Sequence, residues 1–94
     1  MSGINMLQKK QEIIECLIKF LEIGNFIDVI RNNKKPIQTR IVYISRESKY
    51  LEVNDWLQRI WRCNFRDLEL LEMTLVIPEH KLIHVEEYEF AGNN

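Results

Sequence analysis

The segment VNDWLQRIWRCNFR, which covers residues 53–66, contains both tryptophans of the chain, one of its two cysteines and three arginines. At 100° per residue, its apolar residues fall in one arc of a helix and the arginines fall on the opposite side. We therefore predict a helix, running to about Cys63, that packs on a core and presents an arginine stripe outwards. The arc comprises Val53, Trp56, Leu57, Ile60, Trp61 and Cys63, and the stripe comprises Arg59, Arg62 and Arg66.

The size and composition of the chain indicate one small folded domain. Ninety-four residues, 46% of them hydrophobic and 29% charged, predict a single domain over 1–94, with 91–94 as a flexible tail. Cys16 and Cys63 lie in apolar helical patterns, so we expect buried thiols in a reducing compartment, with a disulfide between them as the alternative. Because we find neither an export signal nor a run of ~20 apolar residues, we expect a cytoplasmic location, in a cell or an infected host.

The N-terminal third is predicted to be helical. Met6–Ile23 places apolar residues on one side and lysines and glutamates on the other, which is typical of an amphipathic helix. Gly24 suits the end of that helix, and Asn25 can cap a second, short helix over Phe26–Asn32. This second helix must end before Pro36, because the residue preceding a proline avoids the α region.

The middle of the chain is predicted to contain a hairpin. Thr39–Ser45 is β-branched and aromatic, and it has apolar residues on both faces, with Ile41 and Tyr43 on the same face. This pattern predicts a strand at the centre of a sheet. Tyr50–Val53 is interpreted as its returning strand, with the first turn of the following helix as the alternative.

The C-terminal part is predicted to form a second hairpin. Leu68–Ile77 and Lys81–Phe90 alternate between apolar and polar residues around a turn at Pro78. A three-residue loop would pair Leu75 with Ile83 and would put the apolar residues of both strands on one face. The predicted order is therefore α-α-β-(β)-α-β-β. It gives an α+β fold with an antiparallel sheet of three or four strands and two or three helices packed on one face.

Charge is distributed unevenly although the net charge is −1. Residues 31–66 contain nine basic and three acidic residues, net +6, and residues 67–94 contain one basic and seven acidic residues, net −6. Either the two blocks neutralise each other within the fold, or they form opposite surface patches. Opposite blocks in one chain also favour association with a second copy, so a homodimer is plausible.

Three common motifs of phosphate binding, metal binding and redox chemistry do not occur in this sequence. There is no glycine-rich phosphate loop, no CxxC and no HExxH, and we expect no cofactor and no metal. His80 and His84 are too far apart in a turn and a strand to share a metal. His84 and Glu86 could form an acid–base pair on one strand face.

We expect the protein not to be an enzyme but a small protein-binding module that acts by surface-complementary contact. Inhibitors, adaptors and immunity-type proteins, including those of phages, are examples of this class. The first alternative is nucleic-acid binding through residues 31–66, and the second is a small hydrolase or isomerase that uses His84 and Glu86. No membrane contact is expected. The predicted partner-binding residues are Arg59, Trp61, Arg62, Arg66, Lys34, Lys35, Glu86, Glu87 and Glu89.

Overall fold

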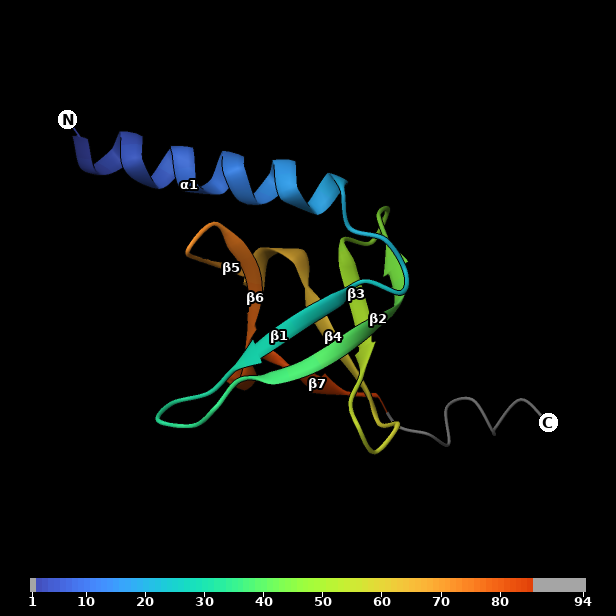
Figure 1. The fold of residues 1–94 in the computed structure, drawn as a ribbon. Coiled ribbons are helices and arrows are strands. Elements are labelled where there is room, and N and C mark those ends of the chain that lie inside the picture. Colours follow the sequence, from blue (N-terminus) through green and yellow to red (C-terminus); the bar gives the residue numbers. More distant parts are fainter. Residues whose placement is uncertain (1, 86–94) are drawn as a thin grey trace.

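The computed structural model describes residues 2–85, with the side chains of residues 6 and 8–85, and contains one α-helix and one sheet. The helix α1 lies across one end of the strongly curled sheet (Figure 1). The elements are α1 (Ser2–Lys19), β1 (Phe26–Ile30), β2 (Ile37–Ser45), β3 (Tyr50–Asn54), β4 (Ile60–Asn64), the 3-10 helix η1 (Phe65–Asp67), β5 (Glu69–Leu71), β6 (Thr74–Pro78), the 3-10 helix η2 (Glu79–Lys81) and β7 (Ile83–His84).

The sheet has seven strands in the order β5-β6-β1-β2-β3-β4-β7. β1 pairs parallel with β6, whereas every other neighbouring pair of strands is antiparallel. The predicted antiparallel sheet of three or four strands with two or three helices is therefore wrong. The prediction missed strands because several short strands, each of two to five residues, lie where a longer helical or alternating pattern was inferred.

The segment 53–66 is not a helix but the end of β3, a turn, β4 and η1. Val53 pairs with Trp61 and Leu51 pairs with Cys63 across the hairpin, and all but Trp61 are fully buried. Two short strands separated by a turn placed apolar residues at intervals that imitate one face of a helix. Trp56 and Leu57, which the helical interpretation put in the apolar arc, are exposed in the turn.

The predicted second helix is also a strand. In β1, Ile27 and Val29 are buried while their neighbours face outwards, which is the period of two expected for a strand. Asn25 does not cap a new helix. Its side-chain oxygen accepts a hydrogen bond from the backbone N–H of Glu22 at 2.8 Å and closes the turn that follows α1.

Three predicted elements are confirmed. The N-terminal helix exists, although it ends at Lys19 rather than Ile23, and Tyr50 begins the strand that returns from β2. β2 is the middle strand of the seven. Within β2, however, Ile41 is buried and Tyr43 is 46% exposed, because a register shift between them changes the face that Tyr43 presents.

The predicted C-terminal hairpin is wrong in its pairing. Residues 68–77 do not form one strand, because Glu72 and Met73 adopt positive φ angles of 49° and 65° and reverse the chain. Leu75 consequently pairs with Leu70 of β5, and not with Ile83. β7 pairs with β4 instead, and the predicted strand residues beyond Val85 and the predicted tail 91–94 lie outside the described residues.

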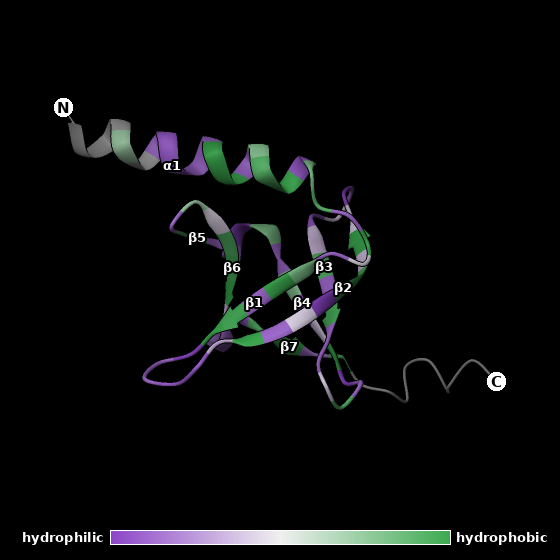
Figure 2. Ribbon diagram, in the orientation of Figure 1, coloured by the Kyte–Doolittle hydropathy of each residue, from purple (hydrophilic) through white to green (hydrophobic). Residues whose placement is uncertain are grey.

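The core lies between the curled sheet and the C-terminal half of α1. Ile14 and Ile18 of the helix are buried together with apolar residues of the strands, and Figure 2 shows hydrophobic residues along β1 and β6. The core residues are Ile14, Ile18, Ile27, Val29, Ile41, Leu51, Val53, Cys63, Leu68, Leu75 and Ile77. Cys63 is buried as predicted, but Cys16 is exposed, and both thiols are free. In residues 2–85, no helix has the length and apolar character needed to cross a membrane.

Candidate functional site

The turn between β3 and β4 is organised by the carboxylate of Asp55. Its Oδ1 accepts hydrogen bonds from the backbone N–H groups of Leu57 at 2.8 Å and Arg59 at 3.0 Å. The backbone of Asp55 also bonds to that of Arg59 and Gln58, each at 3.0 Å, and Gln58 has a positive φ of 64°. A short aspartate side chain that accepts from the backbone two and four residues ahead stabilises a tight turn.

The second oxygen of Asp55 binds two side chains that flank the turn. Oδ2 accepts from Nε of Arg59 at 2.7 Å and from Nε1 of Trp61 at 3.0 Å. Asp55 itself is only 7% exposed. Burial raises the pKa of Asp55, but the hydrogen bonds from Trp61, Arg59 and Leu57 outweigh it and hold the pKa below its ordinary value. The carboxylate is therefore charged at neutral pH, and each of its oxygens accepts two hydrogen bonds.

This network fixes a turn that presents large apolar side chains to solvent. Trp56 is 62% exposed and Leu57 is 60% exposed. The guanidinium of Arg59 lies 5.8 Å from the ring centre of Trp56 and 5.7 Å from that of Trp61, so it bridges the two indoles. We call the exposed group Trp56, Leu57 and Arg59 the tip surface.

A small cavity of about 170 Å³ lies beside the tip surface, between the turn, the neighbouring hairpin and η2. Its wall contains Trp56, Arg59 and Trp61 from the β3–β4 hairpin, together with Arg31 and Glu79. The cavity is thus mixed in character, with aromatic rings and both signs of charge at one opening. Its size suits one inserted side chain rather than a cofactor.

The predicted arginine stripe does not exist as one surface. Arg62 is one residue from Trp61 on β4 and faces the other side of the sheet, where it binds Glu52 at 2.7 Å and stacks over Tyr50 at 4.3 Å. Arg66 is exposed on η1, near α1. Only Arg59 and Trp61, of the four predicted partner-binding residues in this segment, are brought together by the fold.

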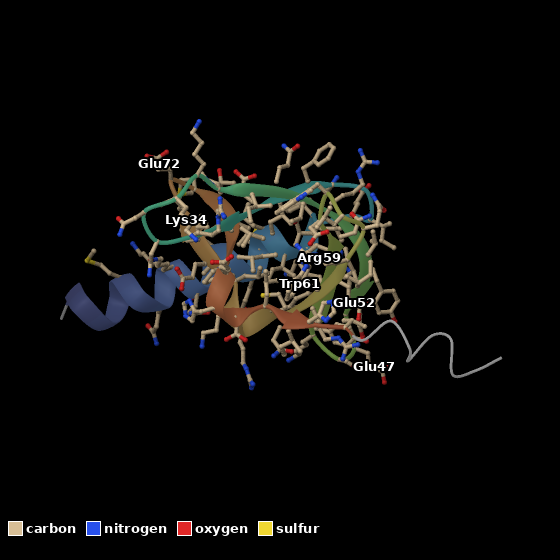
Figure 3. All side chains as sticks on the ribbon, turned by 90° about the horizontal axis from the view of Figure 1, so that it is seen from below. Lys34, Glu47, Glu52, Arg59, Trp61 and Glu72 are labelled. Atoms are coloured by element: carbon tan, nitrogen blue, oxygen red, sulfur yellow. The ribbon has the colours of Figure 1, made fainter. Side chains whose placement is uncertain are left out.

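The other predicted partner-binding residues do not join the tip surface. Lys34 and Lys35 are exposed on the β1–β2 loop, which Arg31 braces by donating from Nε to the backbone oxygen of Lys35 at 3.0 Å. Figure 3 shows Lys34 well apart from Arg59 and Trp61. Glu86, Glu87 and Glu89 lie outside the described residues, so the acidic C-terminal contact surface stays a prediction.

The two histidines lie in different surroundings. His84, on β7, contacts Trp61 with ring centres 4.8 Å apart and ring planes inclined at 55°, and His80 lies in η2. Glu86, the proposed acid–base partner of His84, lies outside the described part of the chain, so that pair stays a prediction. No group of three or more His, Cys, Asp or Glu residues suited to a metal ion occurs within residues 2–85.

Sequence reasoning missed Asp55, Trp56 and Leu57 as site residues. The available signal was the pair Asn54-Asp55, because such residues favour turns and Asp55 can bond to the backbone ahead of it. The helical periodicity of the flanking residues outweighed that signal. Comparisons with protein-family models, with curated proteins and with solved structures give no match to this chain.

Proposed function

We propose that this protein is a non-enzymatic protein-binding module that contacts its partner through the tip surface. The observation that carries the proposal is that Trp56 and Leu57 are both at least 60% exposed on a turn that the buried Asp55 holds in place. Tryptophan and arginine are the residue types most enriched in the energetic centres of protein interfaces. Leu57 adds apolar area next to them.

The rigidity of the turn supports this proposal. Two large apolar groups in water are unfavourable for the free protein, and burial of such a side chain in an interface contributes about 1.5–3 kcal/mol. The Asp55 hydrogen bonds fix the turn before any partner arrives, so association loses less conformational entropy than it would with a mobile loop. Contact at the tip surface alone would block a partner sterically, as an inhibitor or adaptor does.

A protein partner is favoured over nucleic acid by the pairing of the basic residues. Arg59 and Arg62 are each bound to a carboxylate, those of Asp55 and Glu52, which reduces the charge available for phosphates. The exposed cations Lys34 and Lys35 lie on a separate loop, and Lys49 and Arg66 lie beyond the other end of β3, so these charges are scattered. Only Trp56 offers a largely open indole face for stacking on a base. Nucleic-acid binding by residues 31–66 is therefore the second candidate.

The experiment compares the wild-type protein with the variant Trp56→Ala/Leu57→Ala. Affinity capture from the native host, with and without nuclease, first provides a candidate partner, and calorimetry with the purified partner then measures the affinity directly. We expect the double variant to bind at least about 30-fold more weakly, as the loss of two central apolar contacts predicts. The control is Phe20→Ala/Ile23→Ala, which removes two exposed apolar side chains at the end of α1 and in the turn after it.

The results separate the candidate functions. Unchanged affinity of the tip variant for a captured protein would overturn the proposal. Capture that disappears with nuclease, together with a salt-dependent shift of RNA or DNA, would favour the second candidate. If the only partner is a second copy, the tip variant should lower the oligomeric state measured by light scattering while the control does not.

A further inference from the structure

A larger hollow lies at the opposite end of the sheet from the tip surface. β3 connects the two ends, because the β2–β3 turn precedes it and the Asp55 turn follows it. The hollow has a volume of about 470 Å³ and lies between α1, the β2–β3 turn and η1. In Figure 1 the light-green β2–β3 turn lies beside the C-terminal end of α1. The hollow is lined by Gln11, Ile14, Glu15, Ile18, Arg46, Lys49, Phe65 and Arg66.

The lining combines an apolar floor with an excess of positive charge. Ile14 and Ile18 belong to the core, and Phe65 packs partly buried against it. Around this floor are three cations and a single acidic residue, Glu15. Cations gathered over an apolar surface attract a ligand that has a negative group on an apolar body.

Two of the three cations are available to such a ligand. Arg46 is already engaged, because Nη1 donates to the backbone oxygen of Ile18 at 3.0 Å and Nη2 to that of Leu21 at 2.7 Å. It therefore neutralises the partial negative charge at the end of α1. Within residues 2–85, the side chains of Lys49 and Arg66 form no hydrogen bond or ion pair.

We propose that this hollow, bounded by Lys49 and Arg66 over the floor of Ile14, Ile18 and Phe65, binds a small amphiphilic organic acid. The acid group, a carboxylate or a phosphate ester, binds between Lys49 and Arg66, and its short apolar body lies on the floor. The hollow has the volume of a typical small-molecule site, roughly 300–1,000 Å³. A lysine and an arginine together suit either acid group, since the first provides a point charge and the second a planar fork.

The test uses two related dyes. 8-Anilinonaphthalene-1-sulfonate is an amphiphilic anion that fluoresces in apolar sites, and N-phenyl-1-naphthylamine is its uncharged counterpart. The variant Lys49→Gln/Arg66→Gln removes both cations. It should weaken binding of the anionic dye roughly tenfold, as the loss of two partly exposed charged contacts predicts. Binding of the neutral dye should be unchanged. The control Lys34→Gln/Lys35→Gln makes the same charge change on the β1–β2 loop and should leave the binding of both dyes unchanged.

Competition then identifies the acid group. Displacement of the anionic dye by hexanoate indicates a carboxylate ligand, and displacement by phenyl phosphate indicates a phosphate ester. Either displacement supports the proposal if it is absent in the variant Lys49→Gln/Arg66→Gln. The proposal is overturned if the anionic dye binds Lys49→Gln/Arg66→Gln as tightly as it binds the control Lys34→Gln/Lys35→Gln. It is also overturned if neither competitor displaces the dye from the wild-type protein. Circular dichroism confirms that both variants are folded. The result is independent of the tip surface, which lies at the other end of β3.

Discussion

Nε1 of Trp61 donates a 3.0 Å hydrogen bond to Oδ2 of Asp55, so that the beginning of β4 is fixed to the turn that precedes it. Trp61 also packs against the core and contacts the tilted ring of His84 of β7, so this bond adds a link between the turn and the rest of the sheet. The exposed position of Trp56 is thus determined by a buried carboxylate next to it in the sequence. A partner would therefore bind a turn whose conformation is already fixed by the hydrogen bonds of Asp55.

The variant Asp55→Asn should destabilise the protein by about 2–3 kcal/mol. An asparagine oxygen can still accept from the backbone of Leu57 and Arg59, but its NH₂ group then faces two further donors, Nε of Arg59 and Nε1 of Trp61. Urea unfolding at neutral pH measures the change. The control Asp28→Asn alters an exposed strand carboxylate and should change the free energy of unfolding by less than about 0.5 kcal/mol.

The stabilisation from Asp55 should depend on acid pH. The pKa of Asp55 lies below the ordinary value of 3.8 in the folded protein, so its charged form is favoured by folding. The contribution of the charged Asp55 to the free energy of unfolding is complete at pH values above the ordinary pKa of 3.8. It is lost as the pH falls through the lower pKa of the folded state. The difference in unfolding free energy between wild type and Asp55→Asn should therefore shrink below about pH 4. A difference that stays constant, or grows, in acid would contradict this assignment of charge.

Sequence patterns were reliable where one period applied over a long segment. The 3.6-residue period of α1 and the β-branched run of β2 each identified the element correctly. They failed for β1 and β4, both five residues long, and in the second case because Val53, Trp61 and Cys63 are spaced as on a helix although they lie on two paired strands. The parallel pairing of β1 with β6 joins segments more than 40 residues apart and leaves no local signal.

The candidate site was predictable only in part. Arg59 and Trp61 were identified from residue type, because exposed arginine beside tryptophan is typical of interfaces. The arrangement of Arg59 and Trp61 in space could not be predicted, because it depends on the turn formed by Asp55 and on the alternation of β4 side chains between two faces. That alternation separates Arg62 from both of them, which a helical interpretation could not indicate.

The pair of Glu52 and Arg62 should be strongly coupled. Glu52 is only 8% exposed, and Arg62 reaches its Oε2 with Nε at 3.0 Å and Nη2 at 2.7 Å. Removing the arginine leaves a carboxylate without that partner in a poorly hydrated position, so Arg62→Gln should destabilise the protein by about 2–3 kcal/mol. A double-mutant cycle with Glu52→Gln should give a coupling energy of about 1–2 kcal/mol. Additive effects of the two substitutions would show that the ion pair adds no stability.

Arg46 should hold the end of α1 against the sheet. Its guanidinium donates to the carbonyl oxygen of Ile18, in the last turn of α1, and to that of Leu21, just after the helix. The Ile18 oxygen also accepts from the backbone N–H of Leu21 at 3.1 Å, so Arg46 adds a second bond there. Arg46→Gln should therefore cost roughly 1–3 kcal/mol and speed amide hydrogen exchange in the last turns of α1. Arg40→Gln is the matched control, because among residues 2–85 the interaction of the Arg40 side chain is with the exposed ring of Phe26. Equal exchange in the two variants would exclude an anchoring role for Arg46.

The two cysteines should react with thiol reagents at very different rates. Cys16 is exposed on α1, whereas burial, with the charge of Asp67 adding to it and Lys81 opposing it, raises the pKa of Cys63 to about 12. Only the thiolate is nucleophilic, so near pH 8 the native protein should react rapidly at Cys16 and at Cys63 only after unfolding. Ellman's reagent, with and without denaturant, measures both phases. Cys16→Ser should remove the rapid phase, whereas a rapid phase that persists in this variant would show that the hairpin of β3 and β4 opens readily and that the tip surface is not rigid.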